Sequence, residues 1–480
     1  MAATGNQSSD EKALLGGYYQ ARDEKPLLGN HSEFPRQSKW TCQHGLATLF
    51  KTACLIAVAV LMIPLFVIRA HRHSDLHSYL SSNSNIKIHD EPGSDPPAQC
   101  FDNSTASFHF DFYRLQNFTL AEVFNLDRPF SASERYLRSN IRLLPASFFQ
   151  AQDILVKASV TSNNLLVLEQ LQHEVTDSSL AFTIPVPRND EDLCLVVNLD
   201  LYVRTSLSLE NLNIFSTLAN VQILLPPTVR IRNEANINID VGAVTALPFP
   251  SSQKTRIYAG AGAILGAYTI NDLLMLNTTS GAISVDVAPN PMNRDSATPA
   301  EFFAKTTAGS MNISYPPPQW TFIPKRTYEV TVVSGAGLIE GRFLHGRKTH
   351  LESSAGNMVA SILPFYMNTD NPSWLHTQSV AGDQKITILA PHYPKIPLAG
   401  FTSTHKTGIG RLELQYPDEW EGSMRGETAM GSVIMNGTDV EIIDQGTRWP
   451  AGHYVNAIRG DGDNRLTCST GTGSIFANVG

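Results

Sequence analysis

A repeated glycine motif in the C-terminal half constrains the fold of this chain more than any other sequence feature. A small polar pair, a glycine and alternating apolar residues recur in TTSGAISVDVAP (278–289), TTAGSMNISYPP (306–317) and SSAGNMVASILP (353–364), with looser copies TGIGRLELQYP, TAMGSVIMNG and STGTGSIFANVG. Glycine permits the backbone conformation of a tight turn, and the alternation behind it predicts a strand with one apolar face. The motif therefore predicts glycine corners, each followed by a short strand, at Gly281, Gly309, Gly356, Gly410, Gly431 and Gly473.

The spacing of these corners indicates stacked coils. Their intervals are 28, 47, 54, 21 and 42 residues. An interval of about 20 residues suits one coil of a solenoid, and the longer intervals suit two. The alternation places Ile283, Val285 and Val287 on one face of a strand, and Met311 and Ile313 on one face of the next. One coil cannot enclose a core by itself, so we expect a parallel β-solenoid here, with a β-sandwich as the alternative.

The region before the repeats also predicts strands. From Cys100 onward, short runs such as DILVKASV, LCLVVNLDLYV and VRIRNEANINIDV alternate apolar and polar residues, and Pro, Asn, Asp and Gly separate them. Only residues 119–124 suggest a turn of helix. The chain from residue 100 onward is therefore expected to be all-β.

One segment near the N-terminus predicts a membrane-spanning helix. TACLIAVAVLMIPLFVI (52–68) carries no charge across 17 residues. Its flanks extend it to about 20 residues, enough to cross a bilayer. The expected fold class is an all-β ectodomain, with a parallel β-solenoid in its C-terminal part, joined to one N-terminal transmembrane α-helix. The predicted domains are a disordered cytosolic tail (1–46), the transmembrane helix (47–69), a polar stalk (70–99), an N-terminal β region (100–200) and a repetitive β-solenoid domain (201–480).

Potential N-glycosylation sites place the body of the chain outside the cytosol. Basic residues are nearly balanced on the two sides of the apolar segment, so the size of the C-terminal part and its Asn-X-Ser/Thr triplets decide the orientation. We expect a type II single-pass membrane glycoprotein. The acceptor residues that follow the apolar segment are Asn103, Asn117, Asn277, Asn312 and Asn436.

The cysteines of the predicted ectodomain fit an oxidising compartment. Three of the five cysteines, Cys100, Cys194 and Cys468, follow the apolar segment, and three thiols allow one disulfide and one free thiol. A disulfide between Cys100 and Cys194 is the pairing that we expect. Three scattered cysteines do not predict a metal site, which needs close pairs of ligands.

The N-terminal tail holds the same short signal twice. DEKALL (10–15) and DEKPLL (23–28) each place an acidic residue four positions before a leucine pair. They resemble acidic dileucine sorting signals, and two copies on one tail raise the effective concentration for rebinding. The resemblance implies clathrin-adaptor-type sorting complexes as partners and the vacuole or lysosome membrane as destination, with the plasma membrane second. The residues concerned are Asp10, Leu14, Leu15, Asp23, Leu27 and Leu28.

The TxSGxIxV repeats and the long runs of strand before them resemble the putative-adhesin β-solenoid domain of bacterial and fungal membrane proteins. The likeness covers roughly residues 200–480. It implies an adhesin-like β-solenoid, and that family has no agreed catalytic residues to carry over. Because one fold hosts many functions, the resemblance implies a structural or interaction module rather than a reaction.

No motif of the chain predicts a cofactor, a metal or a catalytic centre. GAGAILG (260–266) and GAGLIEG (335–341) resemble dinucleotide-binding loops but open no helix, and RGDGDN (459–464) offers too few oxygens for calcium. All three are expected to be turns. A net charge of −8 argues against nucleic-acid binding. The carboxylates that a glycan-cleaving enzyme would need are dispersed, the candidates being Asp286, Glu340, Asp383 and Glu413.

The expected function is noncatalytic. We predict a type II single-pass membrane glycoprotein whose adhesin-like β ectodomain is a structural or interaction module for a glycan or protein ligand. The alternatives are a membrane-tethered glycan-active enzyme and a vacuolar-membrane regulatory protein. Such an enzyme would need two carboxylates about 5 to 10 Å apart. In the strands SVDV and RLEL, Asp286 and Glu413 take the outward, polar phase, where a solvated face is the default.

Overall fold

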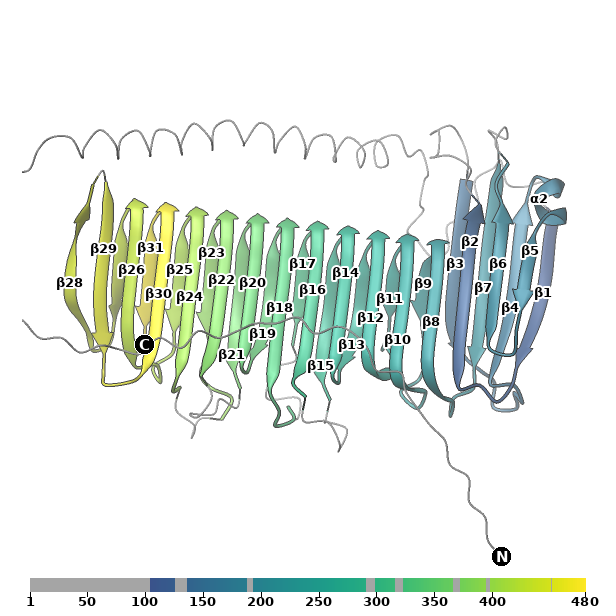
Figure 1. The fold of residues 1–480 in the computed structure, drawn as a ribbon, viewed down its shortest axis with the longest axis horizontal. Coiled ribbons are helices and arrows are strands. Elements are labelled where there is room, and N and C mark those ends of the chain that lie inside the picture. Colours follow the sequence, from purple (N-terminus) through teal and green to yellow (C-terminus); the bar gives the residue numbers. More distant parts are fainter. Residues whose placement is uncertain are drawn as a thin grey trace, which may run out of the picture. The chain divides into compact units, whose positions relative to one another are not determined.

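Strands make up almost all of the described chain. The computed structural model describes residues 104–125, 136–187, 193–290, 298–315, 323–365, 372–393, 398–449 and 451–480, all within one compact unit, Ser78–Gly480. Most consecutive strands alternate between two large sheets, here called sheet A and sheet B (Figure 1). Apolar residues recur at every second position of most strands, so these strands turn one face to the space between the sheets and the other to solvent.

In the described residues, sheet A has 15 strands and sheet B has 16. Across sheet A, hydrogen-bonded neighbours follow in the order β1 (Ser104–Phe112), β4 (Ile154–Ser162), β7 (Cys194–Val203), β3 (Tyr136–Pro145), β9 (Asn220–Ile223), β11 (Val244–Ala246), β13 (Ile264–Ile270), β15 (Ile283–Pro289), β17 (Met311–Ser314), β19 (Ile339–His345), β21 (Met358–Pro364), β23 (Gln384–Ile388), β25 (Leu412–Tyr416), β31 (Ile475–Val479) and β27 (Val433–Gly437). Across sheet B, the order is β28 (Val440–Arg448), β29 (Gly452–Arg459), β26 (Gly422–Met430), β30 (Asn464–Thr472), β24 (Phe401–Ile409), β22 (Ser373–Ala381), β20 (Lys348–Ala355), β18 (Tyr328–Ala336), β16 (Ala300–Ala308), β14 (Leu273–Ser280), β12 (Ser251–Ala261), β10 (Arg230–Val241), β8 (Ser208–Leu218), β2 (Asn117–Asn125), β6 (Ser179–Pro185) and β5 (Gln172–Val175).

Each coil contributes one strand to sheet A and one strand to sheet B, and the coils stack in parallel. In sheet B, β10 pairs in parallel with β8 and β12, and in sheet A, β11 pairs in parallel with β9 and β13. From β10 onward, two residues join a sheet B strand to the sheet A strand of the same coil. These turns line one edge of the stack, which we call the glycine edge. The connections that return to sheet B line the opposite edge, which we call the loop edge.

A ladder of glycines with positive φ occupies the glycine edge. Glycines of neighbouring coils stack so closely that a Cβ on Gly309 would lie 2.0 Å from the carbonyl oxygen of Gly281. No side chain fits at that distance, so the stacking requires glycine. The predicted glycine corners are confirmed, since all six belong to this ladder. Its rungs, in spatial order, are Gly242, Gly262, Gly281, Gly309, Gly337, Gly356, Gly382, Gly410, Gly473 and Gly431.

The small polar residue of the motif lies three positions before its glycine and is buried. The hydroxyl of Thr306 donates to the carbonyl oxygen of Gly281 at 3.2 Å, and Thr407 donates to Gly382 at 3.2 Å. The motif threonine thereby satisfies a carbonyl oxygen of the preceding coil. Where serine takes this position, its buried hydroxyl has no hydrogen-bond partner in the described residues, as in Ser334, Ser353 and Ser379.

The inward positions of the coils form one continuous hydrophobic core. Ile283, Val285 and Val287 are buried as predicted, and so are Met311 and Ile313. Parallel pairing places Ile283 directly beside Met311 of the next coil, so equal positions of the repeat stack on one another. The predicted facing of these strands is confirmed.

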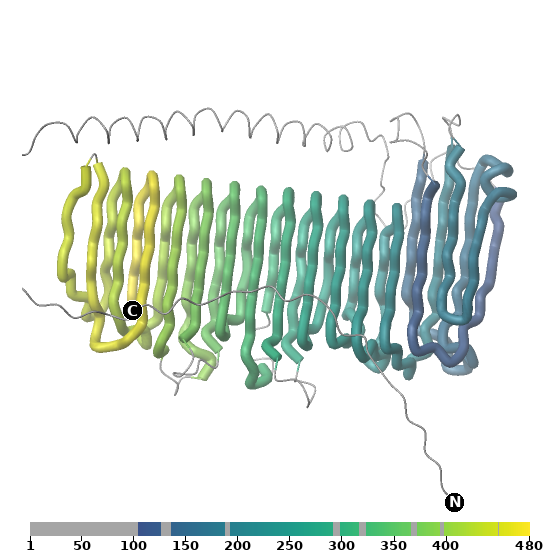
Figure 2. The backbone as a smooth tube through the Cα atoms, in the orientation of Figure 1, coloured from purple at the N-terminus to yellow at the C-terminus, as the bar shows by residue number. Residues whose placement is uncertain are grey.

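The last coil of the chain is inserted between two earlier ones. β26 and β27 follow β24 and β25 in sequence, but the C-terminal strands β30 and β31 lie between the two coils in space. Figure 2 shows this as a yellow coil between greener neighbours. The hairpin of β28 and β29 then pairs antiparallel beside β26 and extends sheet B. The C-terminal residues therefore complete the inside of the stack rather than its end.

The expected fold class is wrong in joining the β ectodomain to a transmembrane α-helix. The described residues contain one α-helix, α2 (Leu165–Glu169), with Asn164 as its N-cap, and none that is long and apolar enough to cross a membrane. Apolar residues of the described chain recur mainly with a period of two, which builds strands rather than a long apolar helix. The segments predicted as tail, transmembrane helix and stalk, residues 1–99, lie outside the described residues.

The helical turn expected at residues 119–124 is also wrong, since these residues lie in β2. Glu122 takes an inward position of this strand and interrupts the apolar alternation that would have marked it. Its buried carboxyl group accepts hydrogen bonds from the hydroxyl of Ser139 on sheet A and, at 2.5 Å, from that of Ser216 on sheet B. The carboxyl group thus joins the two sheets from inside.

Glu122 should make the stability of the fold depend on pH. Burial raises the pKa of Glu122 from its ordinary value of 4.5 to about 7, against the opposing effect of the two serine hydroxyls. The folded chain then holds this proton more tightly than the unfolded chain. Its contribution to the free energy of unfolding is full below about pH 4.5 and is lost as the pH rises through about 7, a change of about 3 kcal/mol.

We expect Glu122→Gln to remove this loss. Between pH 5 and pH 8, the free energy of unfolding in urea should fall by about 2 kcal/mol more for the unmodified chain than for the variant. Burial lowers the pKa of His345 and His405 to about 3, so their contribution is lost as the pH falls below about 6.5. The unmodified chain and the Glu122→Gln variant both carry these histidines, so the contribution of the histidines cancels when the two free energies of unfolding are subtracted. Identical pH dependence of the two proteins would contradict the assignment to Glu122.

Candidate binding surface

The outer face of sheet B carries a cluster of amide and aromatic side chains on β8, β10 and β12. Parallel pairing places equal positions of the three strands in rows across the sheet. One row reads Asn213, Asn236 and Arg256, and the next reads Phe215, Asn238 and Tyr258. We call this cluster the asparagine–aromatic face. Its residues are Asn211, Asn213, Phe215, Asn236, Asn238 and Tyr258.

The two aromatic rings of this face are exposed although they lie on a regular sheet. Phe215 is 37% exposed and Tyr258 is 40% exposed. β10 lies between their strands, so two strand spacings, about 9.6 Å, separate the rings along the stack. The hydroxyl groups of Tyr258 and of Thr279 on β14 lie 3.2 Å apart, and this hydrogen bond holds the Tyr258 ring in place.

Of the four amide groups of the face, those of Asn211 and Asn213 are hydrogen-bonded to neighbouring strands and those of Asn236 and Asn238 are not. Asn213 donates to the hydroxyl of Thr119 at 3.4 Å. Asn233 donates to Asn211 at 3.0 Å, and Asn211 donates to Asn117 at 2.7 Å, forming a ladder across three strands. The side chains of Asn236 and Asn238 make no hydrogen bond to any other described residue. Their donors and acceptors are therefore free to bind a ligand.

Cross-strand ion pairs neutralise the arginines beside the face. Arg256 contacts the carboxylate of Glu234, and Arg232 lies 3.3 Å from that of Glu210. The face therefore offers ring faces and amide hydrogen bonds with little net charge, an arrangement that suits an uncharged polar ligand.

A buried polar network lies inside the coils of β22 to β25. The imidazole of His405 contacts the hydroxyl groups of Thr377 and Tyr416, each at 2.8 Å, and Tyr416 donates to Ser403 at 2.7 Å. All four residues are buried, and burial lowers the pKa of His405 to about 3. The ring is therefore neutral at physiological pH, and the network holds the core together rather than contacting a ligand.

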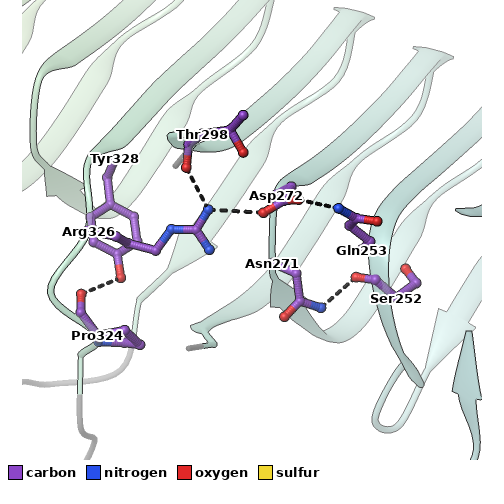
Figure 3. A network of polar contacts seen from close by, with 8 residues as sticks. All are labelled: Ser252, Gln253, Asn271, Asp272, Thr298, Pro324, Arg326 and Tyr328. Atoms are coloured by element: carbon purple, nitrogen blue, oxygen red, sulfur yellow. Dashed lines mark hydrogen bonds and ion pairs between the residues drawn. The ribbon is translucent and has the colours of Figure 1, made fainter. Parts of the chain in front are cut away.

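A buried ion pair ties neighbouring coils together at the loop edge (Figure 3). The Nη2 atom of Arg326 donates to Oδ1 of Asp272 at 3.1 Å and to the carbonyl oxygen of Thr298 at 3.0 Å. Gln253 donates to the other carboxylate oxygen of Asp272 at 2.7 Å. These residues come from β12 and from the connections before β14, β16 and β18, so the pair fixes the return path of successive coils.

Four of the five predicted glycosylation residues lie on strands. Asn312 on β17 and Asn436 on β27 are exposed on sheet A, and Asn117 is exposed at the start of β2. Asn277 on β14 is half-buried, and its Oδ1 is buried without a hydrogen-bond partner in the described residues. Asn103 lies outside the described residues. Asn277 is thus the least accessible of the four.

Cys194 is disulfide-bonded, and its partner lies outside the described residues. Since Cys100 also lies there, its pairing with Cys194 stays a prediction. Cys468 is a buried free thiol, and burial raises its pKa to about 12. The sorting residues lie outside the described residues as well, namely Asp10, Leu14, Leu15, Asp23, Leu27 and Leu28.

The motifs that resembled ligand-binding loops are turns. Gly262 of GAGAILG and Gly337 of GAGLIEG are rungs of the glycine ladder. In RGDGDN, the side chains of Asp463 and the buried Asn464 each accept a backbone N–H at the start of β24, at 2.9 Å and 3.0 Å. Across the part of the chain that the structure describes, no group of three or more His, Cys, Asp or Glu residues could hold a metal ion.

Of the candidate carboxylates, the structure brings only Asp383 and Glu413 close to each other. Asp286 and Glu413 point outward as predicted, but β15 and β25 lie five strand spacings apart, about 24 Å. Glu340 lies two strands and two residues from Asp286, about 12 Å by the same spacings. Glu413 is held by Lys385 at 3.1 Å, and Asp383 accepts a backbone N–H at 2.7 Å. Asp383 and Glu413 lie one strand and two residues apart, about 8 Å, within the range of about 5 to 10 Å that glycoside hydrolysis needs, but both carboxylates are engaged in these contacts.

Comparison with known proteins gives distant structural likenesses only. No protein-family profile matches the chain, and no curated protein matches it. A solved structure named putative adhesin from Parabacteroides distasonis ATCC 8503 has 11% identity, with 65% of this chain and 98% of that chain covered, at a TM-score of 0.30. A second structure named putative adhesin, from Parabacteroides merdae ATCC 43184, has 10% identity, with 65% of this chain and 96% of that chain covered, at a TM-score of 0.27. A cell adhesion protein from Clostridium sporogenes ATCC 15579, also called putative, has 8% identity, with 78% and 100% covered, at 0.13.

The sequence singled out one strand of the asparagine–aromatic face, β10 in VRIRNEANINIDV, but not the face. Phe215 and Tyr258 occupy the outward phase of NLNIFSTL and KTRIYAGA, where a polar residue is the rule. An aromatic residue in the polar phase of two coils that flank a third was the available signal. It needed the coil register, which only the stacked structure supplies.

Proposed function

We propose that this chain is a noncatalytic, adhesin-like interaction module whose asparagine–aromatic face binds an extended, uncharged glycan. The observation that carries the proposal is the row of Phe215, Asn238 and Tyr258, which alternates an aromatic ring, an amide and an aromatic ring. Aromatic faces bind the apolar faces of sugar rings, and amides bind their hydroxyl groups. The two-strand spacing of the rings, about 9.6 Å, is close to the repeat of two sugar units in an extended chain.

The stacked coils supply a rigid platform for such a face. Backbone hydrogen bonds join β8, β10 and β12 on both sides of an irregularity between Ile231 and Glu234, and the core beneath them is buried. Side chains fixed on a preformed sheet lose less conformational entropy on binding than side chains on a loop. This supports recognition along the length of the stack.

The disulfide at Cys194 supports a location outside the cytosol. Structural disulfides persist in secreted and lumenal proteins and are rare in reducing compartments. An extracellular or lumenal module would also meet the polysaccharides that the proposed face would bind. The glycan-active enzyme is the weaker alternative, because Asp383 and Glu413, the candidate carboxylates that lie within about 10 Å of each other, are engaged by Lys385 and Arg411.

The proposal predicts that glycan binding depends on the two rings. Phe215→Ala/Tyr258→Ala in the full chain should weaken the affinity for gluco- or chito-oligosaccharides by about tenfold or more, as measured by calorimetry. Trp374→Ala is the matched control, since Trp374 is 47% exposed on the same sheet but lies on β22, away from the face. It should leave the affinity within about twofold.

Three results would count against this function. The unmodified chain could fail to bind every oligosaccharide tried, or the control could weaken binding as much as the double variant. Release of new reducing ends from the oligosaccharide, lost in Asp286→Asn or Glu413→Gln, would instead favour the enzyme.

A further inference from the structure

Three buried polar side chains in the coils of β22 to β24 form the parts of an acyl-transfer site. Thr377 on β22 supplies a hydroxyl group, Gln384 on β23 supplies a carboxamide, and His405 on β24 supplies an imidazole. Each is at most 1% exposed. The Thr377 hydroxyl donates to Oε1 of Gln384 at 2.6 Å and lies 2.8 Å from Nδ1 of His405. A nucleophile, a base and an acyl group therefore meet within hydrogen-bond distance.

The hydroxyl and the carboxamide take inward positions where the preceding coil has apolar residues. Parallel pairing places Thr377 beside Leu351 and Gln384 beside Met358. The chain turns at Gly382, so β22 and β23 face each other across the core and bring the two polar side chains together. Polar groups at buried positions are costly unless they are paired, so their meeting in one coil needs a reason beyond filling the core.

The orientation of the Gln384 carboxamide is fixed. Its Nε2 donates to the carbonyl oxygen of Lys406 at 2.5 Å. A carbonyl oxygen can only accept, so the amide nitrogen must lie on that side and Oε1 on the side of Thr377. The acyl carbon, which is bonded to Oε1, therefore lies beside the Thr377 hydroxyl.

The hydrogen bonds behind His405 fix its tautomer. Ser403 donates to the carbonyl oxygen of Arg465 at 3.3 Å, and Tyr416 donates to Ser403 at 2.7 Å. The Tyr416 oxygen, 2.8 Å from Nε2, is left as an acceptor, so Nε2 carries the ring hydrogen and Nδ1 carries a lone pair. Burial lowers the pKa of His405 to about 3, which keeps the ring neutral. The lone pair that faces Thr377 is therefore available as a base.

We propose that Thr377 and Gln384 form an ester cross-link by a reaction of the folded chain with itself. Rotation of the Thr377 hydroxyl moves its hydrogen bond from Gln384 to Nδ1 of His405 and turns an oxygen lone pair toward the acyl carbon. Oγ1 then bonds to Cδ of Gln384 while Nδ1 takes the hydroxyl proton. The C–N bond of the carboxamide breaks, Nδ1 gives the proton to the leaving nitrogen, and ammonia departs. One C–O bond replaces one C–N bond, His405 is regenerated, and no oxidation or reduction occurs.

The fold supplies the positioning and the exclusion of water that this reaction needs. Groups held at hydrogen-bond distance react as though they were present at very high concentration. The closed core keeps out water, which would compete as a nucleophile and would hydrolyse the ester. The reaction occurs once in each molecule, turns over no substrate and is independent of the asparagine–aromatic face. Its product joins β22 of sheet B to β23 of sheet A through the core.

Mass spectrometry of the full chain tests the cross-link. Digestion of the denatured chain with trypsin releases one peptide, residues 349–385, that contains both Thr377 and Gln384. Loss of ammonia should make this peptide about 17 Da lighter than its sequence requires. Hydroxylamine should open the ester, and fragmentation of the peptide should then place a hydroxamate at residue 384. A peptide of unmodified mass would overturn the proposal, whether or not any variant folds.

Thr377→Val removes the nucleophile and keeps the shape of the side chain, so its peptide should show no loss of ammonia. Thr349→Val is the matched control. Thr349 is also buried and lies 2.9 Å from Nδ1 of a buried histidine, His345, but among the described residues it has no side-chain hydrogen bond to an amide. Its peptide should keep the loss. If the loss persisted in Thr377→Val, or disappeared in both variants, it would not come from the Thr377 hydroxyl and the proposal would fail.

Discussion

Gly337→Ala is expected to prevent folding, or to lower the free energy of unfolding by on the order of 4 kcal/mol. Gly337 has a backbone φ of +134°, a value that residues with a side chain rarely adopt. A Cβ there would lie 2.2 Å from the carbonyl oxygen of Gly309, which belongs to the backbone of the neighbouring coil. The coil of Gly337 cannot shift away from Gly309, because on its other side Gly356 stacks on the carbonyl oxygen of Gly337 in the same way. Soluble yield and urea unfolding of the full chain would measure the effect.

Gly400→Ala separates crowding from backbone conformation. Gly400 also has a positive φ, +64°, but the atom nearest to an added Cβ is the Cα of Pro372 at 3.7 Å. This variant should fold and lose only about 1 to 2 kcal/mol, the cost of the left-handed conformation. If Gly337→Ala proved as mild as Gly400→Ala, close stacking of the ladder would not be what requires glycine.

The local part of the fold could be predicted because each coil repeats the same physical problem. Every turn at the glycine edge needs a residue without a side chain, and every strand after it needs alternate apolar residues. Six rungs of the ladder were therefore visible in sequence, from Gly281 to Gly473. Gly242 and Gly382 were not, because no small polar pair precedes them and the motif is weaker there.

The order of the coils could not be predicted, because it depends on pairing between distant strands. The segments of β26 and β30 have similar alternation, and either could pair with β24. In the structure, β24 pairs in parallel with β30, and β26 pairs antiparallel with β29. Hydrogen bonds of the ladder are the same in both arrangements, so the choice rests on side-chain packing and on the hairpin, which no local pattern encodes.

The proposed binding face and the buried Glu122 lie where the alternation rule fails. Glu122 is polar at an inward position, whereas Phe215 and Tyr258 are aromatic at outward positions. Phe148 and Phe149 are apolar in an exposed loop. A sequence that follows its local rule elsewhere and breaks it at a few positions points to those positions as functional or strained. Register across coils is needed to see that Phe215 and Tyr258 lie in one row.

Asp272→Asn is expected to cost about 3 to 5 kcal/mol of the free energy of unfolding, the usual effect of stranding a buried charge. The side chain of Arg326 is 1% exposed, and that of Asp272 is 12% exposed. Two further nitrogens of the guanidinium, Nε and Nη1, are buried without a partner in the described residues. The carboxylate is therefore the main compensation for this cation, and asparagine keeps its shape while removing the charge.

Removing both charges should cost less than removing one. Arg326→Met/Asp272→Asn leaves no buried charge, so its loss should be smaller than that of Asp272→Asn by about 2 kcal/mol, as replacement of buried ion pairs by apolar groups is often neutral. Glu413→Gln is the exposed control. Glu413 lies 3.1 Å from Lys385, with side chains 44% and 60% exposed, and breaking this pair should cost less than about 1 kcal/mol. Urea unfolding at one pH compares the unmodified chain with Asp272→Asn, Arg326→Met/Asp272→Asn and Glu413→Gln. If Asp272→Asn and Glu413→Gln lost the same free energy of unfolding, burial of Arg326 would not be the reason that its ion pair is important for stability.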